Sequence, residues 1–357
     1  MGCALAAGLL LLGAVAGELL LRLLAPESPL TDHGLYVDDP ALGWRLKPGL
    51  AYVGPNGERV AINAHGMRDP ERSREKPPGA RRVLVLGDSF TFGSAVDAGA
   101  TYPRRLEQLL GPGVEVVNAG VPRYSTVQEA TWLEREGPAW GADAIVLGFF
   151  VGNDVWENLT GTHGQDLRVE NGELVERKRG QRSFLRRLRG RSRLYRLFKD
   201  LPELVSDRVR GDDALTRKYH ELELARAAVC LRDEPASWSE AWTRTREALA
   251  RVAAAAAGRP VVLLVIPDEL QVDATLRAAV FERAGADPAA YDLDAPQRRL
   301  AELARQHGFH LVDPLEELRR RTAAGERLYL PLDSHWNGAG HALAAEALAG
   351  PGVPLPR

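Results

Sequence analysis

The chain has 357 residues, and its 46 Lys and Arg against 48 Asp and Glu give a formal net charge of −2. This near-neutral balance provides no case for nucleic-acid binding through charge. The length suits one large α/β domain with additions or two small domains. The two cysteines, Cys3 and Cys230, provide neither a disulfide framework nor the spacing of a metal site.

The amino terminus is apolar. Residues 3–17 carry no charge, and the apolar run continues past Glu18 to residue 24. A cleaved signal peptide would need a basic residue ahead of this run, and there is none. A bilayer-spanning helix needs about 20 apolar residues, and Glu18 can pair with Arg22 one turn later. The sequence therefore predicts an uncleaved transmembrane anchor over 1–25, with a cleaved signal segment as the alternative.

Residues 26–80 are rich in Pro, Gly and Asp, a composition typical of turns and linkers. Short stretches at 36–37, 43–46 and 59–62 have the composition of strands. We expect a linker that becomes a small β-rich extension of the main domain.

From residue 81 the sequence alternates between buried-strand and helix patterns, which is typical of a parallel sheet with helices on both faces. We predict one α/β domain over 81–350. Its predicted strands are 83–86, 114–118, 144–150, 260–266 and 309–312. Its predicted helices are 101–110, 126–135, 238–256, 294–307 and 339–348.

The alternation is interrupted over 155–235, which we predict to be a helical insertion or lid. Within it, 177–199 holds eleven Arg and Lys and no Asp or Glu, interleaved with apolar residues. One interpretation is a solvated helical face. The other is a basic amphipathic segment that contacts anionic lipid.

Four short motifs follow predicted strands or lie in the last loop. They are Gly87-Asp88-Ser89, Asn118-Ala119-Gly120, Gly152-Asn153-Asp154 and Asp333-Ser334-His335. Since ligands of open α/β sheets bind at the carboxyl ends of the strands, we expect the motifs to meet at one edge.

These residue types suit acyl transfer. Ser89 can act as a nucleophile if a base accepts its proton, and His335 can be that base. Asp333 can hold the imidazole in the useful tautomer. The backbone N–H groups of Ser89 and Gly120 and the side-chain amide of Asn153 can form an oxyanion hole.

Other polar residues near these motifs have structural interpretations. We expect Asp88 to fix the nucleophile turn, Asp154 to hold its loop, and His341 to be a buried histidine of a helix. No grouping of His, Cys or carboxylates has metal-ligand spacing, so we predict no metal and no cofactor.

The four motifs together resemble the SGNH, or GDSL, hydrolase superfamily, and residues 63–68 add a resemblance to its bacterial membrane-anchored branch. The resemblance implies a three-layer α/β/α sandwich around a five-stranded parallel, flavodoxin-like sheet with strand order 2-1-3-4-5. The chain departs from the family in one place, because Asp333-Ser334-His335 replaces the usual Asp-x-x-His. The shorter spacing occurs in relatives that handle O-acetyl groups on polysaccharides.

The resemblance implies a serine esterase that hydrolyses carboxylic esters, with O-acetyl groups on envelope carbohydrate as the expected substrate and an extracytoplasmic catalytic domain. Two alternatives use the same residues: an envelope polysaccharide O-acetyltransferase, and a lysophospholipase-type lipid esterase. A non-catalytic glycan-binding module is a third alternative, against which the joint presence of Ser89, Asn153 and His335 argues.

Overall fold

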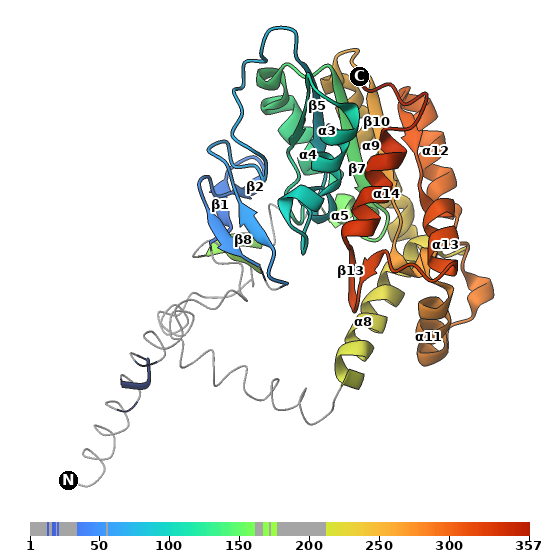
Figure 1. The fold of residues 1–357 in the computed structure, drawn as a ribbon. Helices are drawn as coiled ribbons and strands as arrows, with labels where there is room; N and C mark the ends of the chain where they lie inside the picture. Colours follow the sequence, from blue (N-terminus) through green and yellow to red (C-terminus); the bar gives the residue numbers. More distant parts are fainter. Residues whose placement is uncertain are drawn as a thin grey trace. The chain divides into compact units, whose positions relative to one another are not determined.

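A computed structural model (Figure 1) divides the chain into two compact units, one of Met1–Thr31 with Lys178–Lys218 and one of Asp32–Arg177 with Tyr219–Arg357. Most of the first unit is not described, and the second holds the predicted hydrolase domain. The structure describes residues 13, 16–18, 20, 34–54, 56–160, 167–170, 173–176 and 212–357.

The second unit is built on a five-stranded parallel sheet with the order β11-β10-β7-β5-β6. Numbered along the chain, this is the order 2-1-3-4-5 that the family resemblance implies. All seven residues of the central strand β7 are buried, as expected where helices cover both faces. The strands are β5 (Arg81–Leu86), β6 (Val114–Asn118), β7 (Ala144–Phe150), β10 (Val261–Ile266) and β11 (His310–Val312).

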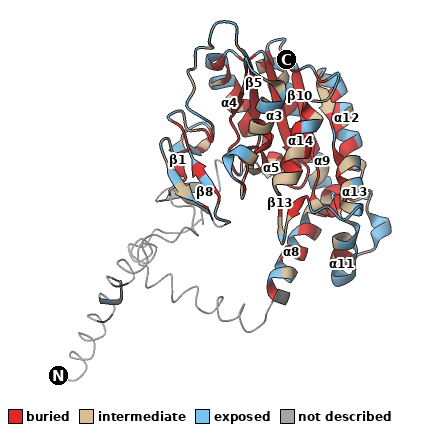
Figure 2. Cartoon of the chain, viewed as in Figure 1, coloured by how far each residue is buried: buried red, intermediate tan, exposed pale blue. Residues whose placement is uncertain are grey.

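Side chains of β5 alternate between two hydrophobic cores, because successive residues of a strand point to opposite faces. Leu84 and Leu86 pack in the core beneath α4, α9 and α12. Val83 and Val85 pack in the core beneath α3, α13 and α14. Figure 2 shows buried residues along the strands and on the inward sides of the helices. The three-layer α/β/α class is therefore confirmed. The helices are α3 (Tyr102–Leu110), α4 (Thr126–Arg135), α9 (Ala236–Ala256), α12 (Ala295–His307), α13 (Leu315–Ala323) and α14 (Gly338–Leu348).

The helices that the sequence did not predict are short or weakly periodic. Outside the predicted insertion, the longest of these among the described residues is α11 (Ala274–Ala284), which Asp273 caps by accepting hydrogen bonds from two backbone N–H groups. Only two of its residues, Val280 and Phe281, are buried, so its sequence lacks a clear apolar face.

The β-rich extension consists of two antiparallel hairpins. The first pairs β1 (Tyr36–Asp39) with β2 (Gly43–Leu46), and the second pairs β3 (Ala51–Val53) with β4 (Arg59–Ala61). The Tyr124 hydroxyl donates to the carbonyl oxygen of buried Trp44 at 2.6 Å and so joins the extension to the sandwich.

Part of the predicted insertion over 155–235 is described. It contains α5 (Asp154–Thr160), a hairpin of β8 (Leu167–Glu170) with β9 (Glu173–Glu176), and α8 (Asp212–Ala227). β8 contacts β1 and β2 (Figure 1), so this part of the insertion is not wholly helical. The basic segment 177–199 lies outside the described residues.

The transmembrane helix expected over 3–24 needs correction. Within the part of the chain that the structure describes, no helix combines the length and apolar character needed to cross a membrane. A spanning helix needs about 20 apolar residues, whereas only 13, 16–18 and 20 are described here, and the rest of 3–24 lies outside the described residues. We therefore withdraw the transmembrane helix.

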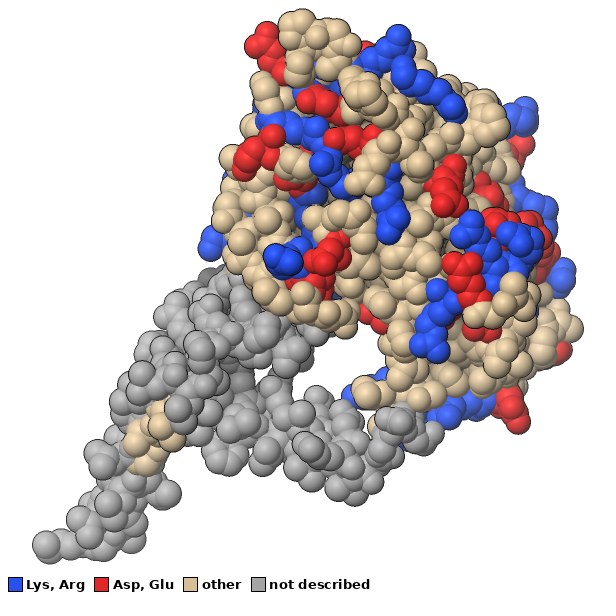
Figure 3. Space-filling model, in the orientation of Figure 1, with Lys and Arg blue, Asp and Glu red and all other residues tan. Residues whose placement is uncertain are grey.

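Charged side chains of both signs are intermixed on the face that Figure 3 shows. Ion pairs account for part of this arrangement. On α13, for example, Glu317 accepts from Arg320 at 2.6 Å and from Arg321 at 3.0 Å. This mixture agrees with the small net charge of the whole chain.

Candidate functional site

The turn that carries Ser89 lies at the carboxyl end of β5 and leads into the short helix α2 (Ser89–Phe92). Gly87 has a φ of 153°, and a Cβ at this position would overlap the Thr91 side chain. Glycine is therefore required for α2 to fold back against the strand. Asp88 is fully buried, and its Oδ1 accepts the Phe90 N–H at 2.9 Å, which fixes the start of the helix.

Ser89, His335 and Asp333 form a continuous hydrogen-bonded chain. Ser89 Oγ lies 2.7 Å from His335 Nε2, although the two residues are 246 positions apart. His335 Nδ1 lies 2.6 Å from Asp333 Oδ1. With the proton on Nδ1, the imidazole donates to the carboxylate and Nε2 can accept the serine proton. This is the geometry that a general base needs to activate a hydroxyl nucleophile.

Both members of the His–Asp pair lie on β13 (Asp333–Trp336), which pairs with the two-residue strand β12 (Tyr329–Leu330). The Phe90 ring packs 5.1 Å from the imidazole and supports it from α2. Burial by itself would raise the pKa of Asp333, but hydrogen bonds from the His335 ring and backbone outweigh it and lower that pKa. The carboxylate is therefore held in the charged form that orients an imidazolium.

Asn153 is placed next to the nucleophile turn by the end of β7. Its Nδ2 donates to Asp88 Oδ2 at 3.4 Å, which leaves the second Nδ2 hydrogen available. The Ser89 N–H at the start of α2 has no hydrogen-bond acceptor among the described residues. These two groups are the donors that the site offers to an oxyanion.

Gly120 does not supply the donor that the sequence analysis expected. Its N–H donates to Asn118 Oδ1 at 3.0 Å, and Asn118 Nδ2 donates to the Thr91 carbonyl oxygen at 2.9 Å. A Cβ at Gly120 would lie 2.7 Å from the Thr91 carbonyl carbon. The glycine is therefore needed for close packing against α2, and we correct its predicted role as an oxyanion donor.

Replacement of Asn153 by Ala should lower kcat by roughly 10²–10³-fold with little change in KM, because an oxyanion donor acts mainly in the transition state. Steady-state kinetics on a short-chain ester measure this. Asn158→Ala is a matched control on α5, the helix that follows Asn153, since its amide donates to Thr245 at 3.1 Å and not into the site. An effect on KM alone would instead make Asn153 a substrate-binding residue.

Buried carboxyl groups gather behind the nucleophile turn. Asp88, Glu129 and Asp154 are almost fully buried. Burial, followed by their mutual repulsion, raises the pKa of Glu129 and of Asp154 well above the ordinary values. Asp154 Oδ2 accepts the Phe150 N–H at 2.8 Å, which gives it the structural role that the sequence analysis expected. Burial and the nearby Asp88 raise the pKa of Glu157 to about 8.

This shift makes the stability of the fold depend on pH. Unfolded glutamate ionises near 4.5, whereas folded Glu157 keeps its proton up to about pH 8. Between these values the folded state binds more protons, so the free energy of unfolding falls as pH rises. Glu157→Gln should flatten the fall of the free energy of unfolding between about pH 5 and 8, by at most ~1.4 kcal/mol per pH unit, and measurements of Tm over this range should show the smaller slope.

The matched control for this prediction is Glu302→Gln, because the pKa of exposed Glu302 is lowered by its hydrogen bonds from Arg305 and Gln306. That substitution should leave the pH slope unchanged above pH 5. An identical slope in wild type and Glu157→Gln would show that Glu157 is ionised throughout.

His341 lies away from the reacting atoms. It is 1% exposed on α14, and its Nδ1 accepts the Tyr102 N–H at 3.3 Å. Burial lowers its pKa to about 3, so it is neutral at physiological pH. Among the described residues, no group of His, Cys, Asp and Glu has an arrangement that could hold a metal ion.

Arg226 on α8 is a residue of the site region that the sequence analysis missed. Its Nη1 donates to Ser334 Oγ, between His335 and Asp333. Nothing in the local sequence signals this contact, because α8 precedes β13 by more than a hundred residues in the chain.

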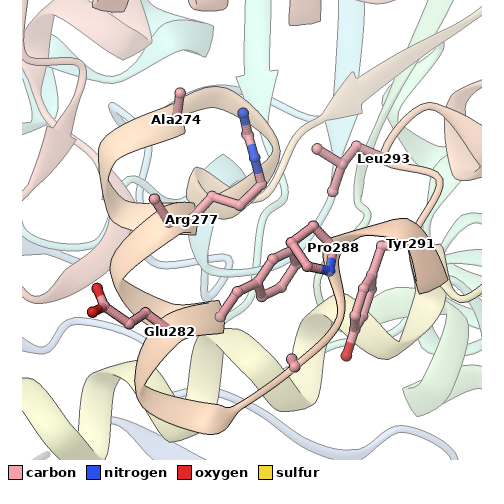
Figure 4. Close-up of a pocket in the computed structure, with 9 residues that line it drawn as sticks. Ala274, Arg277, Glu282, Pro288, Tyr291 and Leu293 are labelled. Atoms are coloured by element: carbon pink, nitrogen blue, oxygen red, sulfur yellow. The ribbon is translucent and has the colours of Figure 1, made fainter.

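A separate pocket of about 600 Å³ lies between α11 and residues 286–293 (Figure 4). Its lining includes none of the predicted site residues. Arg277 in this lining donates to the Leu270 carbonyl oxygen at 2.9 Å, and Phe281 stacks on Tyr291 at 4.6 Å. The pocket therefore contains no part of the Ser–His–Asp chain.

The model of the GDSL-like lipase/acylhydrolase family matches residues 85–343, which include the whole Ser–His–Asp chain and Asn153. The chain belongs to the GDSL-like lipase/acylhydrolase family. As a member of this family it is a hydrolase of ester bonds, as the sequence analysis predicted. No protein of curated function matches the chain.

Solved structures are similar to the chain at low identity. A lipolytic protein of the G-D-S-L family from Veillonella parvula is 14% identical, with 77% of this chain and 100% of that chain covered and a TM-score of 0.42. A catalytic mutant of an acetylxylan esterase from Geobacillus stearothermophilus is 15% identical, with 77% and 94% covered and a TM-score of 0.40. Similarity at this level adds nothing to the functional argument, which rests on the family and on the site.

Proposed function

We propose that this hydrolase is a serine esterase in which Ser89 is the nucleophile, His335 the general base and acid, and Asp333 the group that orients His335. The observation that carries the proposal is the chain of two hydrogen bonds, at 2.7 Å and 2.6 Å, from Ser89 Oγ through the imidazole to the carboxylate.

In the first half of the reaction, Ser89 Oγ attacks the acyl carbonyl carbon while its proton passes to His335 Nε2. The negative oxygen that forms can accept hydrogen bonds from the Ser89 N–H and from Asn153 Nδ2. Collapse of this intermediate breaks the ester bond, and the imidazolium gives its proton to the departing alcohol. The products of this half are a free alcohol and an acyl-Ser89 ester.

In the second half, His335 Nε2 removes a proton from water as the water attacks the acyl-serine. The imidazolium then returns the proton to Ser89 Oγ, and the carboxylic acid leaves. The low pKa of Asp333 supports this cycle, because an ionised carboxylate stabilises the imidazolium in both halves.

We propose O-acetyl groups on carbohydrate of the cell envelope as the substrate. The support is the spacing Asp333-Ser334-His335, which resembles that of family relatives that handle O-acetyl groups on polysaccharides.

The test is a substrate screen of the purified protein. The substrates are nitrophenyl esters with acyl chains of roughly two to twelve carbon atoms, an acetylated oligosaccharide and a lysophospholipid. We expect the acetyl esters to react fastest and free acetate to appear from the oligosaccharide. Preference for the lysophospholipid would indicate a lipid esterase. Transfer of acetyl to a second glycan in place of acetate release would indicate an O-acetyltransferase.

A further inference from the structure

The strand that carries the His–Asp pair has little support of its own. β13 pairs with a strand of two residues, and the register shifts between Tyr329 and Leu330. Leu332, immediately before Asp333, has a φ of 54° and is 46% exposed. A short, irregular hairpin of this kind is only marginally stable alone. The orientation of Asp333 therefore depends on contacts from outside the hairpin.

Arg226 provides such a contact on the opposite face of β13. Ser334 is 4% exposed and points inward, since alternate residues of a strand face opposite sides. Its Oγ accepts a hydrogen bond from Arg226 Nη1. A guanidinium thus holds the one residue that lies between His335 and Asp333 in the chain.

Arg226 is itself fixed by three neighbours. Its Nη1 lies 3.3 Å from Glu223 Oε1 on the same helix and 3.9 Å from Asp268 Oδ2, just after β10. The guanidinium carbon lies 5.3 Å from the centre of the Phe150 ring, at the end of β7. The Arg226 side chain is only 18% exposed. It therefore connects β13 to the ends of two sheet strands.

The positive charge of Arg226 also affects the pKa of Asp333 in the site. Burial and the neighbouring Asp268 raise the pKa of Glu223 to about 10, so Glu223 is neutral at pH 7 and does not cancel the charge of Arg226. The positive charge of Arg226 is one of the effects that lower the pKa of Asp333. Asp333 also faces His335 on its own strand and Glu269 on the helix Glu269–Val272.

We propose that Arg226 is a positioning residue, which sets the orientation of the Asp333–His335 pair through its hydrogen bond to Ser334. The inference rests on the proposed function, because it assigns Arg226 to the geometry of that same pair. The proposal also gives the shortened Asp-x-His spacing a physical basis. Ser334, the residue between Asp333 and His335, accepts the hydrogen bond from Arg226 that holds the strand in place.

The test compares Arg226→Met, Arg226→Lys, Ser334→Ala and the double variant Arg226→Met/Ser334→Ala on p-nitrophenyl acetate, a neutral ester. We expect Arg226→Met to lower kcat by roughly 10–100-fold with KM unchanged, since small displacements of catalytic groups cost about this much. Ser334→Ala should cost less. The double variant should be no slower than Arg226→Met, because both changes remove one interaction. Arg226→Lys should recover part of kcat.

The pH dependence of kcat distinguishes a positioning role from a merely structural one, because a structural role would leave it unchanged. Loss of the positive charge in Arg226→Met removes an effect that favours the deprotonated Asp333–His335 pair, so the acid limb of kcat should shift to higher pH. Arg226→Lys and Ser334→Ala should keep the wild-type limb. The matched control is Arg251→Met with Thr131→Ala, because Arg251 makes the same kind of link to the Thr131 hydroxyl and to Glu134 away from the site.

Loss of Tm in Arg226→Met with kcat and its pH profile unchanged would overturn the proposal, and so would additive effects in the double variant. A rise of KM confined to a negatively charged ester would also overturn it, because Arg226 would then bind substrate. These outcomes are distinct from failure of the proposed function, in which the wild-type chain itself would neither hydrolyse the ester nor react with a fluorophosphonate at Ser89.

Discussion

Replacement of Ser89 by Ala should abolish ester hydrolysis, with a loss of at least ~10⁴-fold in kcat. The hydroxyl oxygen is the atom that forms the acyl-enzyme. The other hydroxyl on α2, that of Thr91, cannot take its place because it is buried and lies 2.6 Å from the Tyr102 hydroxyl. The same variant should lose all covalent labelling by a fluorophosphonate, which mass spectrometry of the intact chain measures. Its Tm should stay within about a few degrees of the wild-type value, because Ser89 is half-buried and contributes little packing.

Ser94→Ala is the matched control. Ser94 lies one turn further along the chain, and its backbone N–H donates to the Ser89 carbonyl oxygen at 3.0 Å. Since an alanine keeps that backbone bond, this variant should retain activity and labelling. If Ser89→Ala kept more than roughly a few per cent of the wild-type kcat, the nucleophile would have to be another group.

Replacement of His335 by Ala should be nearly as damaging, with a loss of ~10⁴-fold or more in kcat, because no other base lies within hydrogen-bond distance of Ser89 Oγ among the described residues. Asp333→Asn should cost ~10⁴-fold or less, since it removes the group that orients the base but leaves the base in place. Kinetics on p-nitrophenyl acetate measure both effects.

His341→Ala tests whether His335 or His341, which lie close together in the chain, is the catalytic base. His341 is buried, so its loss should lower Tm, while kcat per folded molecule should stay within about threefold of wild type. A large loss of kcat in His341→Ala together with an active His335→Ala would reverse the assignment of the base.

Local patterns were sufficient to predict most of the sandwich. The buried strands are continuous apolar runs, and helices such as α3 and α12 have an apolar stripe, so the residues themselves specify which face is buried. The positions of the motifs after predicted strands were also read from the sequence itself. The strand order came from the family resemblance, and the structure confirms that order. The prediction of a transmembrane helix over 3–24 was wrong, since no helix among the described residues is long and apolar enough to cross a membrane.

The identity of the candidate site residues was also readable in the sequence, because glycine turns and polar residues after buried strands are local signals. Which atoms those residues bind was decided only by tertiary packing. Ser89 meets His335 across 246 positions, Gly120 gives its N–H to Asn118, and Arg226 reaches Ser334 from a helix of the insertion. A residue type fixes which hydrogen bonds a side chain can make, but the partner depends on which elements the folded chain brings within about 3 Å of it.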